Sequence, residues 1–150
     1  MIFLIIAVIL FVTDFVLKKY MDQKLQYGME EEILEGNIIL NKVHNHGAIF
    51  GFLQEQKEIL RFLSLMAAGF IVLLFTITLP RNRKYLTKIG LALILGGGAN
   101  NLYERLTKGY VVDYFSFKQL KRLVFNLSDI FVFLGTALCI ISDLIKKNKG

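Results

Sequence analysis

FNLSDIFVFLG, residues 125–135, places two polar side chains, Asn126 and Asp129, at the start of a long apolar run. In a membrane, an ionisable group at the centre of a helix costs roughly 2.5 to 3.5 kcal/mol on insertion scales. A charge at this depth therefore predicts a functional site, with a partner supplied by another part of the chain.

The remaining sequence supports a membrane setting for this run. The chain has 150 residues, of which 55% are hydrophobic, and its mean hydropathy of +0.53 is unlike that of a soluble domain. A helix of about 20 residues crosses the roughly 30 Å of hydrocarbon in a bilayer. We therefore predict an all-α membrane protein with one domain and four transmembrane helices, at about residues 2–18, 59–79, 86–103 and 123–145.

Charges in the connecting segments predict the orientation of these helices. Residues 80–88 and the tail after residue 145 are basic without an acid, which is typical of cytoplasmic segments. Both termini are then cytoplasmic, and the acidic segment at about residues 20–58 is outside. The basic connection at 104–122 does not fit this pattern. The net charge of +6 suits lysines beside anionic lipid and does not indicate nucleic-acid binding.

The outer segment has a pattern of its own. IILNKV at 38–43 favours a strand, HNHG at 44–47 favours a turn, and AIFGFL at 48–53 is apolar again. We predict a small extracytoplasmic β-sheet on the membrane surface, with Asn45 and the apolar Ile49, Phe50 and Phe52 over a substrate. Residues 108–122 are predicted to add a short strand or half-helix followed by a basic turn.

The polar residues with candidate functions gather at the outer ends of the predicted helices. Asn101 and Arg105 are four residues apart, and Asn126 and Asp129 are three apart, so each pair shares one helix face. The predicted topology places seven such residues on the outer side of the membrane: Asp14, Asn45, Asn101, Arg105, Asp113, Asn126 and Asp129.

Several of these polar residues also have structural interpretations. Asp14 can pair with Lys18 four residues on, and Asp143 has the same spacing to Lys147. Arg105 can extend its guanidinium to the headgroups, and Asp113 alone can be a solvated charge. His44 and His46 share a strand face but lack a third ligand, so no metal site and no cofactor are expected.

Two aspartates at one depth, without a recognisable cysteine or serine nucleophile, indicate activation of water by a carboxylate pair. Two close carboxyl groups cannot both ionise easily, so they share one proton over a wide pH range. One member can then act as a base toward water and the other as an acid toward the scissile amide. This chemistry is aspartyl proteolysis, with Asp113 and Asp129 as the candidate pair.

Four motifs carry a resemblance to a known family. NHGAIFG at 45–51, GGGANNLYERLTKGYVVDYF at 96–115 and FNLSDIFVFLG at 125–135 resemble motifs of lipoprotein signal peptidase, or signal peptidase II, and VTDFVLKKY at 12–20 is a looser fourth. The resemblance implies a protease of the bacterial cytoplasmic membrane, with its site toward the outer face. It implies cleavage of diacylglyceryl-modified prolipoproteins just before the lipid-bearing cysteine, inhibition by globomycin, and action as a monomer.

The resemblance also implies roles for individual residues. Asp113 and Asp129 match the catalytic pair, and Asp14 matches a structural support residue. The positions that bind substrate or support the pair are matched by Asn45, Asn101, Arg105 and Asn126.

Three positions depart from the pattern that the family usually shows. Asn100 stands in place of Gly, Glu104 in place of Asp, and Ser128 in place of Ala. Two other functions are alternatives, one suggested by the polar residues within the helices and one by these departures. A small transporter or proton-coupled channel would use Asp14, Arg105 and Asp129 along a path, and an inactive scaffold of the same fold would carry the departures without catalysis.

Overall fold

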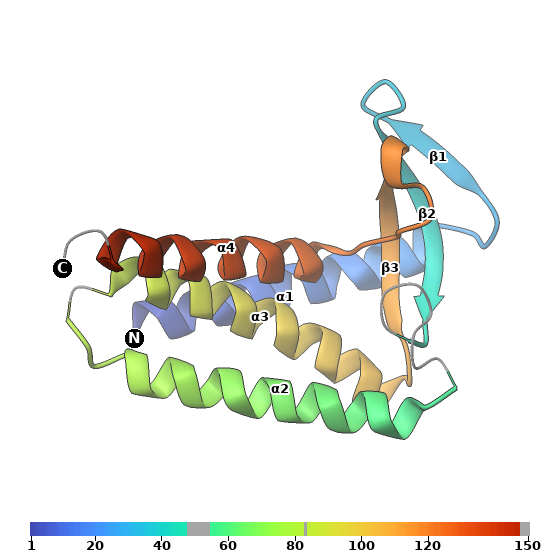
Figure 1. The fold of residues 1–150 in the computed structure, drawn as a ribbon. Coiled ribbons are helices and arrows are strands. Elements are labelled where there is room, and N and C mark those ends of the chain that lie inside the picture. Colours follow the sequence, from blue (N-terminus) through green and yellow to red (C-terminus); the bar gives the residue numbers. More distant parts are fainter. Residues whose placement is uncertain (48–54, 83, 148–150) are drawn as a thin grey trace.

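The computed structural model describes residues 1–47, 55–82 and 84–147. These residues form four long helices and a three-stranded antiparallel sheet (Figure 1). The mainly helical fold with a small sheet is therefore confirmed. The elements are, in chain order, α1 (Ile2–Lys24), β1 (Glu30–Ile33), β2 (Ile38–Asn45), α2 (Lys57–Thr78), α3 (Tyr85–Thr107), β3 (Val111–Phe117), the 3-10 turn η2 (Lys118–Leu120) and α4 (Leu127–Lys147).

Helix α3 lies at the centre of the bundle and contacts α1, α2 and α4. Its glycines permit this close packing. A Cβ atom on Gly96 would lie 2.7 Å from the Ala7 carbonyl oxygen of α1, and one on Gly97 would lie 2.5 Å from the Ser128 carbonyl oxygen of α4. The backbones of α1 and α4 therefore approach α3 more closely than any larger residue would allow.

Two of the described helices, α2 and α4, are long and apolar enough to cross a membrane by length and composition. Helices α1 and α3 carry buried polar residues, among them Asp14, Lys18 and Asn100. Four transmembrane helices therefore stay a prediction. The outer face of α1 is nevertheless apolar, because it exposes Ile2, Leu4, Ile5, Val8, Ile9, Val12 and Val16.

The sheet stands across one end of the bundle, opposite Met1 and the connection between α2 and α3 (Figure 1). Strand β2 is central and pairs antiparallel with β1 and β3. Its register places Asn45 opposite Val111 and Val43 opposite Asp113, after an irregularity that follows Leu40. The sheet thus brings the end of β2 beside the aspartate of β3.

Two predicted helix ends are displaced in the structure, one at the end of α1 and one at the start of α4. α1 continues to Lys24, beyond the predicted end near Lys18, because Lys18 is buried beside opposite charges and does not mark a membrane boundary. α4 begins at Leu127 and not at 123, because Phe125 first pairs with Phe115 of β3. The ends of α2 and α3 depart from their predicted ranges by about a turn or less.

The predicted outer segment is partly corrected. His44 and Asn45 belong to β2, so the predicted turn at 44–47 was wrong for its first half, because β2 continues to pair with β3 there. Strand β1 was not predicted. The expected apolar stretch, with Ile49, Phe50 and Phe52, lies outside the described residues.

One surface ion pair also differs from its prediction. Asp143 pairs with Lys146 at 3.1 Å, three residues on, and not with Lys147. Both spacings place the partner on the same helix face, so sequence spacing alone could not decide between them.

Candidate active site

Asp113 and Asp129 come from different elements that meet at the sheet end of the bundle. Asp113 lies on β3 and is only 2% exposed, while Asp129 lies in the first turn of α4. Between the two aspartates, Phe125 pairs antiparallel with Phe115, and the chain turns back toward the bundle. This return brings the start of α4 beside the aspartate of β3.

Asn126 and Asp129 form a reciprocal helix cap. The Asn126 side-chain oxygen accepts the Asp129 N–H at 3.0 Å, and the Asp129 carboxylate accepts the Asn126 N–H at 3.1 Å. This is the arrangement of a capping box, in which two side chains three residues apart satisfy each other's backbone donors. It explains locally why NLSD begins a helix and holds the Asp129 side chain in place.

Amide groups donate to all four carboxylate oxygens of the aspartate pair. Asp113 accepts the side-chain N–H of Asn126 at 2.6 Å on one oxygen and that of Asn45 at 2.9 Å on the other. Asp129 accepts the side-chain N–H of Asn101 at 2.9 Å and the backbone N–H of Asn126. Within the described part of the chain, Asn126 thus links the two carboxylates through its own donors.

Asp113 titrates close to neutral pH. Burial and the nearby Asp129 carboxylate raise its pKa from 3.8 to about 7, against the opposing effect of the hydrogen bonds from Asn45 and Asn126. A carboxyl group with this pKa can hold or release a proton under ordinary conditions. The side chain is therefore suited to proton transfer.

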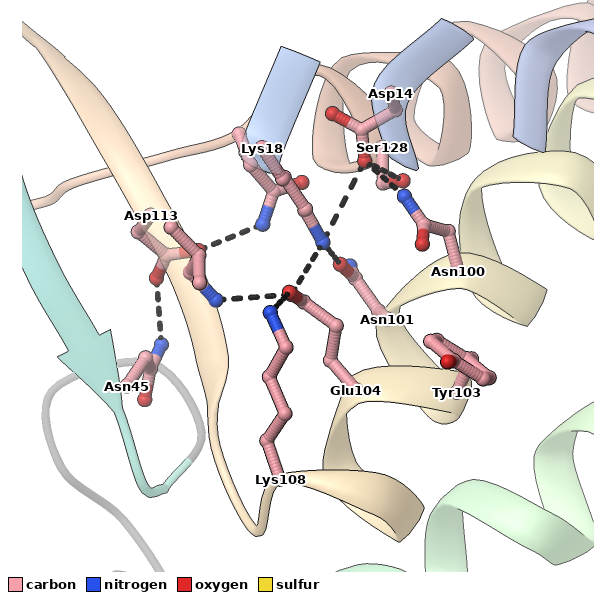
Figure 2. Close-up of polar contacts among 12 residues, drawn as sticks. Asp14, Lys18, Asn45, Asn100, Asn101, Tyr103, Glu104, Lys108, Asp113 and Ser128 are labelled. Atoms are coloured by element: carbon pink, nitrogen blue, oxygen red, sulfur yellow. Dashed lines mark hydrogen bonds and ion pairs between the residues drawn. The ribbon is translucent and has the colours of Figure 1, made fainter. Parts of the chain in front are cut away.

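A buried ion cluster centred on Lys18 lies beside Asn101, the residue that donates to Asp129 (Figure 2). The Lys18 ammonium is 1% exposed and donates to the Asn101 side-chain oxygen at 2.6 Å. It also lies 3.0 Å from a Glu104 oxygen and 3.5 Å from an Asp14 oxygen. The expected pairing of Asp14 with Lys18 is therefore present, but Lys18 has further partners.

Glu104 connects this cluster to β3. One of its oxygens accepts the Lys108 ammonium at 2.7 Å, and the other accepts the backbone N–H of Val112 at 2.9 Å. Val112 directly precedes Asp113. A single buried carboxylate thus joins α1, α3 and the strand that carries one of the paired aspartates.

Asp14 contacts neither Asp113 nor Asp129 by a hydrogen bond in the described structure. Its carboxylate instead accepts the Asn100 side-chain N–H at 2.7 Å and the Ser128 hydroxyl, and the Tyr114 hydroxyl lies at 3.3 Å. It therefore ties α3, α4 and β3 to α1.

Arg105 stands apart from the hydrogen bonds around the two aspartates. Its charge interacts with the carboxylates of Asp129 and Asp113, but no carboxylate of the described residues lies within ion-pair distance of it. Its Nε atom is buried and has no hydrogen-bond partner among those residues. The Arg105 guanidinium is therefore close enough to Asp113 and Asp129 for their charges to act on it, and its Nε–H has no acceptor among the described residues.

The histidines beside Asn45 are engaged in other contacts. His44 shares hydrogen bonds with Asp22 at 2.9 Å and with the Tyr27 hydroxyl at 2.5 Å, and it stacks on Tyr110. His46 also packs against the Tyr110 ring. The described residues contain no group of three metal-ligating side chains.

Several residues of this site were not assigned a role by the sequence. Lys18 was noted only as a partner for Asp14, and Asn100, Glu104 and Ser128 only as departures from a pattern. The spacing of Asp14 and Lys18 and the NLSD capping signature were the available signals. Neither one reveals which distant side chain each residue meets.

Comparisons with known proteins agree over nearly the whole chain. A family model described as signal peptidase (SPase) II matches residues 6–145. A lipoprotein signal peptidase of Clostridioides difficile is 33% identical over 150 residues, covering 100% of this chain and 99% of its own. One of Trichormus variabilis is 34% identical over 146 residues, covering 96% and 90%.

Solved structures share the fold. One described as a bacterial membrane enzyme has a TM-score of 0.84 at 20% identity, and the match covers 98% of this chain and 90% of that one. A second with the same description has a TM-score of 0.81 at 20% identity, with coverages of 95% and 92%.

Proposed function

The chain belongs to the signal peptidase II family of proteases, and on that premise we propose that it removes signal peptides from prolipoproteins as an intramembrane aspartyl endopeptidase. The substrate is a diacylglyceryl-modified prolipoprotein, cut just before the lipid-bearing cysteine. The observation that carries the proposal is the pair of carboxylates, Asp113 and Asp129, with an amide donor on each of their four oxygens.

In the proposed reaction the pair holds one proton. The ionised carboxylate takes a proton from water as the water oxygen attacks the scissile carbonyl carbon. The protonated carboxyl donates its proton to the carbonyl oxygen, which gives a tetrahedral intermediate. The carboxyl that took the proton from water then passes it to the leaving nitrogen as the C–N bond breaks, and the other carboxylate takes a proton from a hydroxyl of the intermediate, so the pair again holds one proton. The raised pKa of Asp113, about 7, supports a pair that keeps one proton at neutral pH.

The neighbouring polar groups have supporting roles in this proposal. Asn45, Asn101 and Asn126 hold the carboxylates in position, and pre-organised donors of this kind stabilise developing charge without reorganising. Arg105 binds the substrate backbone or the developing oxyanion. Its buried Nε atom, which lacks an acceptor among the described residues, supports that assignment.

The proposed setting is a bacterial cytoplasmic membrane crossed four times, with both termini inside and the site toward the outer face. The sheet and the aspartates lie at the end of the bundle opposite Met1 and the basic connection between α2 and α3, which supports this orientation (Figure 1). The exposed apolar face of α1 supports contact with lipid. One chain supplies both carboxylates, which supports action as a monomer, and the proposed reaction requires only water and these two groups.

Purified full-length protein incubated with a lipid-modified prolipoprotein, with and without globomycin, tests the proposal. We expect cleavage before the modified cysteine and its loss with the inhibitor. Absence of cleavage by folded protein would contradict the proposal. Ion flux in reconstituted vesicles would then favour a transporter, and the absence of flux would favour an inactive scaffold.

A further inference from the structure

We propose that Lys18 is a positioning residue that turns the side-chain amide of Asn101 so that its N–H reaches Asp129, and that Glu104 holds Lys18 for this purpose. This role rests on the proposed function. It concerns how one carboxylate of the pair is held, and neither Lys18 nor Glu104 touches the substrate in it.

The hydrogen bonds around Asn101 have one direction that fits the chemistry of the groups. An ammonium group can only donate, so Lys18 selects the oxygen of the Asn101 amide, 2.6 Å away. The NH2 group of the same amide is then directed to Asp129, whose oxygen accepts it at 2.9 Å. Without the ammonium the Asn101 oxygen loses its donor, and the orientation of the amide depends on its contact with Asp129 alone.

The buried Lys18 side chain requires partners of opposite charge. Lys18 is 1% exposed, and an unpaired ammonium buried to this extent is strongly unfavourable. Glu104 at 3.0 Å and Asp14 at 3.5 Å supply two negative charges, and Lys108 on Glu104 supplies a second positive charge. The four charges balance, so the cluster offsets the cost of burying the Lys18 side chain and holds its donors toward Asn101.

Glu104 also contacts the strand that carries Asp113. The oxygen that faces Lys18 accepts the backbone N–H of Val112, next to Asp113 (Figure 2). Movement of the Glu104 carboxylate would therefore disturb the support of Asp129 through Lys18 and Asn101, and that of Asp113 through β3. In this proposal Glu104 supports the positions of both aspartates without contacting either one.

Two variants separate positioning from stability. Lys18→Met removes the donor and leaves the cluster with a net negative charge. Lys18→Met/Glu104→Gln removes one charge of each sign, so the balance is restored while the donor to Asn101 is still missing. Glutamine keeps a side-chain oxygen that can accept the Val112 N–H, so the contact with β3 is retained. Removing both members of a buried ion pair is often tolerated where removing one is not. The double variant should therefore fold even where the single variant does not.

The measurement is kcat and KM for a lipid-modified precursor, together with the thermal unfolding midpoint, for the full-length protein in detergent. We expect the double variant to regain most of the wild-type unfolding midpoint while kcat stays about tenfold or more below wild type, because the lost orientation is not restored. KM should change by no more than about twofold, since Lys18 does not contact the substrate. Asp143→Asn, in an exposed pair on α4, is the control and should keep wild-type values.

A purely structural role for Lys18 predicts that kcat recovers together with the unfolding midpoint, and that result would overturn the proposal. A double variant that fails to fold would also overturn it, because the balanced cluster is expected to tolerate the change. Wild-type protein that does not cleave the precursor is a different outcome: it removes the proposed function itself, and the positioning role falls with it.

Discussion

Asn126 and Asp129 hold each other through two backbone N–H groups, and the Asn126 side chain also donates to Asp113 at 2.6 Å. Asn126 thus caps α4, orients the aspartate of that helix and contacts the aspartate of β3. The hydrogen bonds of Asn126 thus serve both the helix cap and the proposed catalytic pair.

Substitution of Asn126 should separate the cap from the link between the two carboxylates. Asn126→Ala removes both, and loss of an N-cap costs about 1 kcal/mol of stability. Asn126→Ser keeps a capping oxygen but removes the donor to Asp113. We expect Asn126→Ser to recover the unfolding midpoint and not the turnover. Equal recovery of both quantities would show that Asn126 acts only as a cap.

The rate of cleavage should fall as the pH rises through about 7. Burial and the Asp129 charge raise the pKa of Asp113 to about 7, so the pair loses its remaining proton above that pH. The proton-donating member is then absent. Measuring kcat across neutral pH with a substrate that does not titrate there checks this expectation, and a rate that climbs steadily on the alkaline side would contradict it.

Two adjacent glycines offer a matched test of helix packing beside the site. A Cβ atom on Gly97 would lie 2.5 Å from the Ser128 carbonyl oxygen, whereas one on Gly98 meets nothing within 4 Å among the described residues. Gly97→Ala must push α4 away next to Asp129 and should lower both the unfolding midpoint and kcat. Gly98→Ala should be neutral or stabilise the helix by up to about 1 kcal/mol. Similar behaviour of the two variants would show that this close approach is unimportant.

The lipid on the substrate should matter more than its side chains. Each buried methylene contributes about 0.8 kcal/mol, so two acyl chains would confine the cleavage site to the outer leaflet. Confinement at the depth of Asp113 and Asp129 turns weak peptide contacts into an oriented encounter. We expect much slower cleavage of the unlipidated precursor in the same micelles. Equal rates would favour a general intramembrane protease that recognises the ends of substrate helices.

The sequence located the helices and the candidate aspartates because hydropathy and spacing are properties of short stretches. It could not place Lys18, which stands at the expected end of a span and resembles an interfacial lysine. Only its contacts with Asn101 and Glu104, distant in sequence, show that it is buried. Strand β1 was missed for another reason: its EEEI sequence is largely exposed and does not alternate between polar and apolar residues.

Asp113 and Asp129 together activate water in the proposed reaction. The most direct measurement is the turnover of a lipid-modified prolipoprotein by Asp113→Asn and by Asp129→Asn, each compared with wild type after a thermal unfolding scan has shown that the variant is folded. Asparagine keeps the size of the side chain but can neither take nor give the proton. We expect each folded variant to lose cleavage, and near-normal turnover by either one would remove that residue from the pair.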